Sequence, residues 1–568
     1  MKRVLKSIYF KVALALIGLL ILNFIASKAH TRVDMTKDKR YTLSETTRRV
    51  LLHIKEPVLI EVLLKGDIPT EFKKLQTETL QLLEEYAAMN SNITVQFVNP
   101  LENESDPQAL IQQMVLNGLN PLEISQTEAG NTSKVHIFPW AVISTIENMG
   151  GKQQERRVKV PLFVNKLGAN DQEQVQNSVQ RLEYNFTDAL YKLTLHKQKK
   201  IAILKSNGTL EDIYMADFIK MAREYYYIAP FTLDSVKTNA EKTLRDLQEY
   251  NLLVVPKPTE PFTDPEKQVL DQYVMGGGRV LWLIDNVNIT LDDLYKAGGA
   301  AVAMPVNLNL TDMFFSYGFR INYTLVNDLY FSEIVIATGE GSQSRYMPIP
   351  WVYNPLVLSK NNHLITNHLD AVRLQFANGI DTLKNDIKKT VLLSSSNLAK
   401  ADGTPREISL RINPDQMDKN AYKKGNIPMG VLLEGEFTSV YKDRVRPIDL
   451  KEKADKSLPT KMIVVSDGDI IKNDISGGQP LELGFDKWTS KYYDNKAFLQ
   501  NAVNYLLDDT AFLQLRNKKV QLAFLDKEKV VESKKAWQVK VFVIPLVILI
   551  VTAIALLLGY RKKYRKKC

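Results

Sequence analysis

The residues best placed to do chemistry are four polar side chains at the ends of two predicted strands. Asp285 follows one short apolar run, and Ser466, Asp467 and Asp469 lie at the end of another, residues 461–471. Alternation along a strand sends the side chains of 467 and 469 to the same face, and open α/β sheets bind ligands at the carboxyl ends of their strands. These four residues are therefore the candidates for a crevice that could hold a ligand or a cation. The alternative is that Asp-Gly-Asp only forms a turn and a helix cap.

The sequence lacks the residue sets of the common catalytic sites. The only cysteine is Cys568, so no disulfide, cysteine metal site or cysteine nucleophile is available to a folded domain. The phosphate-loop pattern G-x-x-x-x-G-K-[ST] and the nucleophile elbow G-x-S-x-G are both absent, and the six histidines are scattered. We predict no catalytic residues, no cofactor and no metal, and a protein that is not an enzyme.

Residues 250–287 form the unit that would position the crevice. They are predicted to fold as a strand, a helix and a second strand, the unit from which parallel sheets are built. Either Thr263 or Asp264 caps the helix, with Pro265 at its first position. The glycines 276–278 come after the helix and not before it, which indicates a C-terminal cap and not a phosphate-binding loop.

An N-terminal domain precedes this unit. Its predicted order, β-α-β-α-β-β, is typical of a thioredoxin-like domain, but residues 66–70 read GDIPT where a redox thioredoxin needs C-x-x-C. Redox chemistry is therefore excluded. The predicted fold class is α/β: a thioredoxin-like N-terminal domain plus a flavodoxin/class I amidotransferase-like parallel-sheet domain with a β-rich insertion, flanked by two transmembrane helices.

Two apolar runs predict these membrane segments. Residues 8–27 are apolar apart from Lys11 and Asn23, and residues 541–559 carry no charge, where about 20 residues span a bilayer. Basic residues beside membrane segments stay in the cytoplasm, so we expect an inner-membrane protein with both termini cytoplasmic and the bulk periplasmic. The alternatives are a cleavable signal peptide at the N-terminus and a basic tail that only touches lipid headgroups.

The net charge of +10 is confined to the two tips. Four basic residues within the first 11 positions and six within 561–567 equal the whole excess of 74 Lys and Arg over 64 Asp and Glu. A nucleic-acid site needs a basic folded face, so we expect no nucleic-acid partner.

The predicted organisation has seven parts, one of which carries an insertion. They are a transmembrane helix (8–27), a thioredoxin-like periplasmic domain (28–165), a connecting helix (170–196), an amidotransferase-like ABC transporter auxiliary domain (197–510, with the insertion 290–455), a return segment (511–540), a transmembrane helix (541–559) and a basic cytoplasmic tail (560–568).

Several stretches in this order resemble the GldG family, the gliding-motility-associated ABC transporter auxiliary or "substrate-binding" component of Bacteroidota. They are RVDMTKDKRYTLSETTRRVL (32–51), PVLIEVLLKGDIPTEFKKLQTE (57–78), NFTDALYKLT (185–194), the unit 250–287 and VVSDGDII (464–471). The resemblance covers nearly the whole chain. It implies a GldF-like permease and a GldA-like ATPase as partners, besides membrane lipid, and it brings no catalytic residues.

The leading hypothesis is a non-catalytic, membrane-anchored periplasmic auxiliary subunit of an ABC transporter complex associated with gliding motility. The alternative is a periplasmic ligand-binding module that uses Asp285, Ser466, Asp467 and Asp469. A more remote alternative is a degenerate amidotransferase-like hydrolase.

Overall fold

The chain forms two compact units, residues 1–519 and 520–568. The computed structural model describes residues 17–18, 42–66, 68–102, 104–128, 131–149, 152–164, 170–195, 197–338, 345–359, 361–411, 418–451, 453–516 and 539–565.

The first region of the larger unit contains a four-stranded sheet in the order β2-β1-β5-β6. Strand β1 pairs in parallel with β2 and antiparallel with β5. Strands β4 and β5 are separated around Pro139, which has no N–H for a strand ladder. The elements are α2 (Glu45–His53), β1 (Val58–Val62), α3 (Thr70–Met89), β2 (Ile93–Phe97), α4 (Pro107–Leu116), β3 (Leu122–Glu128), β4 (Asn131–Ile137), β5 (Trp140–Met149) and β6 (Lys152–Pro161).

Helix α5 (Asp171–Thr194) is the long helix expected after this sheet. The side chain of Asn170 caps it by accepting a hydrogen bond from the N–H of Glu173 at 3.0 Å. Its buried residues follow the predicted stripe, and they pack against α2, α3 and β6: Val175, Val179, Leu182, Phe186, Leu190 and Leu193. The helix therefore joins the first region to the rest of the chain.

A seven-stranded sheet, in the order β20-β23-β24-β10-β9-β7-β8, forms the centre of the second region. Five neighbouring strands, from β24 to β8, run parallel, whereas β23 is antiparallel to both of its neighbours. The strands are β7 (Lys200–Leu204), β8 (Tyr227–Phe231), β9 (Leu252–Pro256), β10 (Arg279–Leu283), β20 (Lys388–Ser394), β23 (Pro428–Gly435) and β24 (Thr460–Val465).

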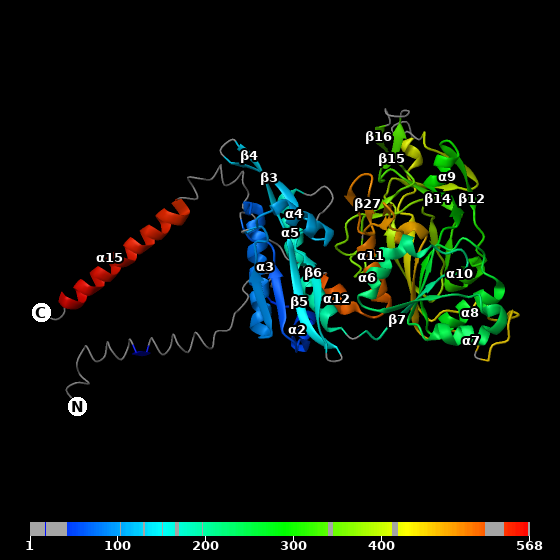
Figure 1. The fold of residues 1–568 in the computed structure, drawn as a ribbon, viewed down its shortest axis with the longest axis horizontal. Helices are drawn as coiled ribbons and strands as arrows, with labels where there is room; N and C mark the ends of the chain where they lie inside the picture. The colour runs from blue at the N-terminus through cyan, green and yellow to red at the C-terminus, as the bar shows by residue number, and fades with distance from the viewer. Residues whose placement is uncertain are drawn as a thin grey trace. The chain divides into compact units, whose positions relative to one another are not determined.

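Helices cover both faces of this sheet. Leu253 and Val255 of β9 join one apolar core, and Leu252 and Val254 join the other. Burial on both faces explains why the strand sequence shows no polar alternation. Figure 1 shows α6 (Ala216–Arg223) and α11 (Asn495–Leu506) on one side of the sheet, and α7 (Val236–Gln248), α8 (Asp264–Met275) and α10 (Thr311–Tyr317) on the other.

Helix α8 begins and ends as its sequence indicates. Thr263 and Glu266 form a capping box, in which the Thr263 N–H donates to Glu266 Oε2 at 2.8 Å. At the other end Gly277 has a φ of +90°, and the N–H of Gly278 donates to the Tyr273 carbonyl at 2.9 Å. This hydrogen bond closes a Schellman turn, so the prediction that the glycines cap the helix is confirmed.

The segment between β10 and β24 builds several two- and three-stranded sheets around a core that includes Trp351, Tyr353 and Phe376. Strands β20 and β23, inside the predicted insertion 290–455, belong instead to the main sheet. The other elements are β11 (Val287–Asn288), α9 (Leu291–Lys296), β12 (Ala300–Pro305), β13 (Phe319–Ile321), β14 (Thr324–Asp328), β15 (Ile334–Thr338), β16 (Arg345–Ile349), β17 (Leu356–Val357), β18 (Val372–Arg373), β19 (Ile380–Thr382), β21 (Ala399–Gly403) and β22 (Arg406–Ser409).

The predicted fold class, an α/β parallel-sheet protein flanked by two transmembrane helices, is wrong. The structure is a mixed α/β fold with many small sheets, and its main sheet includes antiparallel strands. Among the described residues, no helix combines the length and apolar character that a membrane crossing requires. The run 541–559 is shared between a π-helical turn (Val539–Val543) and α15 (Ile544–Arg565).

The predicted N-terminal membrane segment, residues 8–27, lies outside the described residues apart from Ile17 and Gly18.

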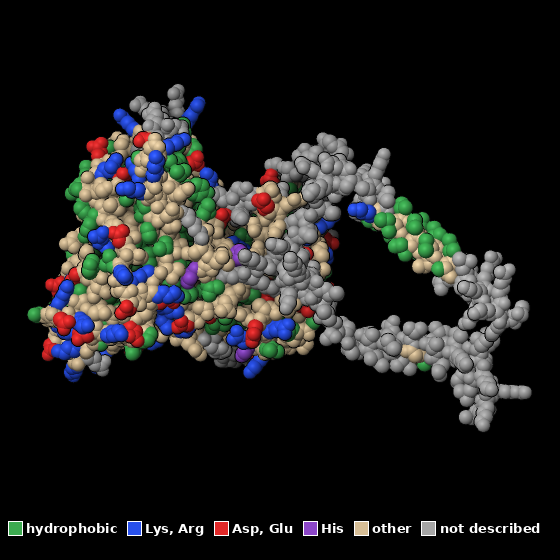
Figure 2. Space-filling model, turned by 180° about the vertical axis from the view of Figure 1, so that it is seen from behind, with side chains coloured by type: hydrophobic (Ala, Val, Ile, Leu, Met, Phe, Trp, Pro, Cys, Tyr) green, Lys and Arg blue, Asp and Glu red, His purple; other side chains and the backbone are tan. Residues whose placement is uncertain are grey.

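On the face of the molecule shown in Figure 2, acidic and basic side chains are interspersed over the described surface.

The close approach of Gly278 to Tyr273 generates a test of the packing at the end of α8. A Cβ atom at Gly278 would lie 2.5 Å from the Tyr273 ring, whereas nothing lies within 4 Å of a Cβ at Gly403. We expect Gly278→Ala to lower the free energy of unfolding by about 1–3 kcal/mol, because the buried ring has to move. Gly403→Ala, the matched control, should change it by less than about 0.5 kcal/mol in the same denaturant titration. Equal effects of the two substitutions would contradict the packing described.

Candidate functional site

The predicted crevice residues lie together at the carboxyl edge of the main sheet. Asp285 follows β10, and Asp467 and Asp469 follow β24, its parallel neighbour. The N–H of Gly468 donates to Asp285 Oδ1 at 2.6 Å. Residues Gly468–Ile471 form a 3₁₀ turn, so the alternation expected from an extended strand does not apply to 467 and 469. Asp-Gly-Asp therefore does form a turn. The turn nevertheless brings the carboxyl groups of Asp285, Asp467 and Asp469 together.

A fourth residue, Lys257, completes this group and was not predicted. It follows β9, the third parallel strand of the edge, and its φ is +49°. The ammonium nitrogen lies 3.1 Å from Asp285 Oδ2 and also forms an ion pair and hydrogen bond with Asp469. The side chains of Lys257, Asp285 and Asp469 are 12, 15 and 9% exposed. We call Lys257, Asp285, Asp467 and Asp469 the edge cluster.

Asp467 is the most deeply buried member of the edge cluster. Its two carboxyl oxygens accept hydrogen bonds from the N–H groups of Gln375 at 2.7 Å and Asp469 at 2.8 Å. Burial, together with the negative charges of Asp285 and Asp469, raises the pKa of Asp467 well above its usual value.

The pKa values of the other two carboxyl groups, those of Asp285 and Asp469, shift in opposite directions beside Lys257. Burial raises the pKa of Asp285, with Lys257 opposing the shift. Burial acts in the same direction on Asp469, but the charges of Lys257, Lys472 and Arg373 and the hydrogen bond from Lys257 together outweigh it, so the pKa of Asp469 is lowered. Asp469 is thus the carboxylate that balances the buried ammonium.

The chain itself covers this edge. Besides the Gln375 contact, the N–H of Asn378 donates to the Ser466 carbonyl at 2.8 Å, and the Ser466 hydroxyl donates to the carbonyls of Asn378 at 2.5 Å and Met429 at 3.1 Å. Asn378 Oδ1 in turn accepts from the N–H of Asn286 at 2.7 Å. Segment 375–378 therefore occupies the place where many α/β sheets admit a ligand.

The contacts limit what the edge cluster can do chemically. The Ser466 hydroxyl donates to carbonyl oxygens, so the described hydrogen bonds provide no base to activate it. In the part of the chain that the structure describes, no group of His, Cys, Asp or Glu is arranged to hold a metal ion. Asp469 Oδ1 is buried without a hydrogen-bond partner. A ligand at Asp285, Ser466, Asp467 or Asp469 remains a prediction, and it would have to displace Lys257 or segment 375–378.

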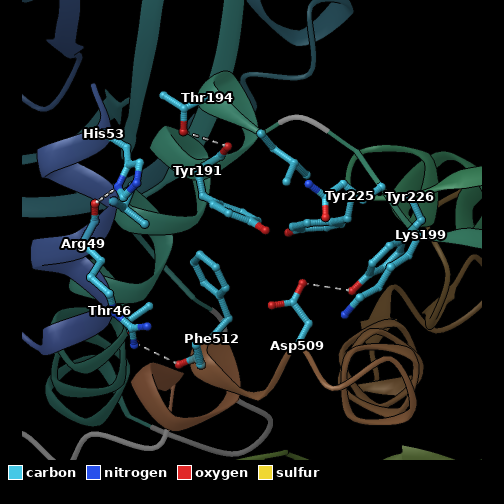
Figure 3. Close-up of a pocket in the computed structure, with 14 residues that line it drawn as sticks. Thr46, Arg49, His53, Tyr191, Thr194, Lys199, Tyr225, Tyr226, Asp509 and Phe512 are labelled. Carbon is cyan, nitrogen blue, oxygen red and sulfur yellow. Dashed lines mark hydrogen bonds between the residues drawn. The ribbon is translucent and has the colours of Figure 1, made fainter. Parts of the chain in front are cut away.

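A separate pocket lies where α2 and α5 meet the second region. We call it the junction pocket. Its volume is about 480 Å³, within the usual range for small-molecule sites. Tyr191 of α5, Tyr225 and Tyr226 after α6, Asp509 after α11 and Phe512 of α12 (Thr510–Arg516) line it, together with Arg49 and His53 of α2 (Figure 3).

Polar contacts fix the walls of the junction pocket. The Tyr226 hydroxyl donates to Asn504 Oδ1 at 2.9 Å and to Asp509 Oδ2 at 3.3 Å. The Tyr225 hydroxyl donates to Asp188 Oδ1 at 2.6 Å, and the rings of Tyr191 and Phe512 lie 4.6 Å apart between centroids. Sequence reasoning missed this site because its residues come from distant segments; the run of tyrosines at 225–227 was the only local signal.

The first prediction from the site concerns Lys257. Lys257→Met leaves three buried carboxyl groups without their cation, so we expect the free energy of unfolding to fall by about 3–5 kcal/mol. Lys388→Met is the matched control: Lys388 pairs with Glu434 at 2.9 Å but its side chain is 71% exposed, so its removal should cost at most about 1 kcal/mol. Denaturant titration of the two variants compares them. Similar losses would show that Lys257 is not the counter-ion of the cluster.

The second prediction from the site concerns how the contribution of Asp467 to the free energy of unfolding depends on pH. A carboxyl whose pKa is raised in the folded state stabilises the protein below its unfolded pKa and loses that contribution as pH rises through the folded pKa. The free energy of unfolding of the native protein, relative to Asp467→Asn, should therefore fall by about 1.4 kcal/mol per pH unit from pH 5 upward while the group stays protonated. Titrations at pH 5, 6 and 7 measure this difference. A difference that is constant with pH would mean that Asp467 is ionised throughout.

Comparison with solved structures gives only distant likenesses. The N-terminal domain of mmIFT52 is 13% identical, with a TM-score of 0.31, and covers 57% of this chain and 100% of that chain. The cytoplasmic protein STM3548 from Salmonella typhimurium is 9% identical, with a TM-score of 0.27, and covers 54% of this chain and 99% of that chain.

Comparison of sequences is more informative. An uncharacterized protein of Borreliella burgdorferi is 20% identical over 428 residues, which are 73% of this chain and 74% of that protein. Residues 37–144 match a domain of unknown function, DUF7088. Residues 198–502, more than half of the 568, match the model of the ABC-type uncharacterized transport system, and they contain the main sheet and the whole edge cluster. The chain therefore belongs to this family of ABC transport system auxiliary components.

Proposed function

We propose that this protein is a non-catalytic auxiliary subunit that binds the permease and ATPase subunits of an ABC transporter. The family match over residues 198–502 is the observation that carries the proposal. ATP hydrolysis must come from another subunit, since the sequence lacks a phosphate-binding loop.

The resemblance of the stretches 32–51, 57–78 and 464–471 to GldG supports a narrower proposal. In it, the partners are a GldF-like permease and a GldA-like ATPase of a gliding-motility system in Bacteroidota. The same resemblance implies a periplasmic position for the folded regions, which we include in this narrower proposal.

The structure supports a bracing role. The ion pairs of Lys257 and the hydrogen bonds of segment 375–378 close the sheet edge that would otherwise admit a substrate. Within the second unit, large apolar side chains between Val541 and Ile554 are exposed. Contiguous exposed apolar surface marks an interaction site, and we propose that in α15 it contacts the permease.

Purification of the transporter from its native host tests this function. A tagged full-length chain should retain both the permease and the ATPase subunits. Leu549, 67% exposed on α15, provides the variant: Leu549→Asp should weaken retention of the permease, because a carboxylate cannot enter an apolar interface. Leu398→Asp, at an exposed apolar residue of the other unit, is the matched control and should retain both subunits. Absence of both subunits from the native preparation would overturn the proposal.

The periplasmic position is tested in the same host. Because Cys568 is the only cysteine, a Cys568→Ser chain with a new cysteine at the exposed position Leu398 has a single thiol. A membrane-impermeant maleimide should label it in intact spheroplasts. Labelling only after lysis would place the second region in the cytoplasm.

A further inference from the structure

The junction pocket has the features of a ligand site that the transporter role does not use. It joins two regions of one unit, and interfaces between regions are favoured positions for small-molecule sites. Its walls come from α2 and α5 on one side, and from the segments after α6 and α11 on the other.

Four Tyr and Phe rings line the junction pocket. Figure 3 shows Tyr191 and Phe512 on one side of the opening, Tyr225 and Tyr226 on the other, and Asp509 between them. The centroids of Tyr225 and Tyr226 are 6.0 Å apart. Aromatic faces attract cations through the negative charge of their π systems. The chain already uses this attraction beside the pocket, where Lys192 Nζ lies 5.0 Å from the centroid of the Tyr225 ring.

The charges that shift the pKa of Tyr191 are negative. Burial, followed by the charges of Asp509 and Asp188, raises the pKa of Tyr191 to about 12. Asp188 is balanced by Lys192 at 2.9 Å. Burial also raises the pKa of Asp509, although Lys199 and the Tyr226 hydroxyl oppose the shift. Asp509 is therefore a partly buried carboxyl group whose charge the surrounding protein does not fully stabilise.

Three basic residues also line the pocket, and their positions determine where a ligand's charge can lie. The Lys199 ammonium donates to the carbonyl of Leu507 beyond the end of α11. Arg49 and His53 are exposed on α2, and His53 Nδ1 lies 2.7 Å from the Arg49 carbonyl oxygen. The mouth beside α2 is thus basic, whereas the aromatic interior faces Asp509. A cationic group is favoured only at the inner end.

We propose that the junction pocket binds a small organic cation, with its ammonium group at Asp509 and its apolar body between the rings of Tyr191, Phe512, Tyr225 and Tyr226. The cation adds an ion pair at Asp509, whose carboxyl group accepts a hydrogen bond from the Tyr226 hydroxyl. The rings contribute dispersion and cation–π attraction at both sides of the apolar body. This proposal does not depend on the transporter partners, since every residue in it belongs to this chain.

Isothermal titration calorimetry of the purified full-length chain tests the proposal with two probes of similar size and opposite charge, phenethylammonium and 3-phenylpropionate. We expect phenethylammonium to bind at least about tenfold more tightly, because only its charge complements Asp509. Stronger binding of 3-phenylpropionate would assign the pocket to anions, and lack of binding by both probes would remove the site. Either result overturns the proposal.

Variants locate the binding. Asp509→Asn keeps the shape of the side chain and should weaken phenethylammonium binding by about tenfold or more. Asp508→Asn is the matched control: the neighbouring carboxylate pairs with Arg279 and Lys461 and does not line the pocket, so binding should be unchanged. Phe512→Leu, a second variant that preserves volume better than Ala, should also weaken binding, whereas Tyr191→Phe, which keeps its ring, should not. Unchanged binding in both Asp509→Asn and Phe512→Leu would show that the cation binds elsewhere.

Discussion

The buried ammonium group of Lys257 is the interaction on which the second region depends. It joins the ends of three parallel strands, since Lys257 follows β9, Asp285 follows β10 and Asp469 follows β24. Removing ions from water costs several kcal/mol for each ion, and only close pairing with further hydrogen bonds offsets this cost. The N–H of Gly468, which donates to Asp285, supplies one such bond. The three strand ends are therefore tied to one geometry.

This constraint changes what the sheet can be used for. Open α/β sheets bind ligands at the edge where the edge cluster lies. Here Asp467 accepts the N–H of Gln375, and Ser466 and Asn378 exchange hydrogen bonds, so the chain covers its own edge. Two cavities lie instead where the first region meets the second. A sheet that braces a partner needs such a closed edge, whereas a substrate-binding sheet needs an open one.

How well the sequence predicted a structural feature depended on how far apart in the chain its interacting residues lie. Helix α8 was correctly predicted with its cap, because Thr263, Glu266 and the glycines 276–278 act on neighbours in sequence. The proximity of Asp285, Asp467 and Asp469 followed from the general geometry of parallel strands. Lys257 directly follows β9, the parallel neighbour of β10, so the same geometry applied to β9 would have included it. Strands β20 and β23 were assigned to an insertion because nothing local distinguishes a strand that joins a distant sheet from one in a small sheet. The predicted membrane helix 541–559 was wrong because nothing in the apolar run indicates that it divides between a π-helical turn and α15.

Helix α5 explains why the junction pocket can keep a fixed shape between two regions. On one side Glu183 Oε1 accepts from the Thr47 hydroxyl at 2.8 Å, and Thr187 Oγ1 lies 2.7 Å from the Tyr86 hydroxyl. One turn further along the helix, Asp188 accepts from Tyr225 and pairs with Lys192, which also pairs with Glu224 at 2.6 Å. Breaking any of these contacts would strand a buried polar group, which costs about 1–3 kcal/mol. The same helix thus fixes Tyr191 against the second region. A pocket whose walls are already ordered can bind a ligand without the entropy cost of ordering them.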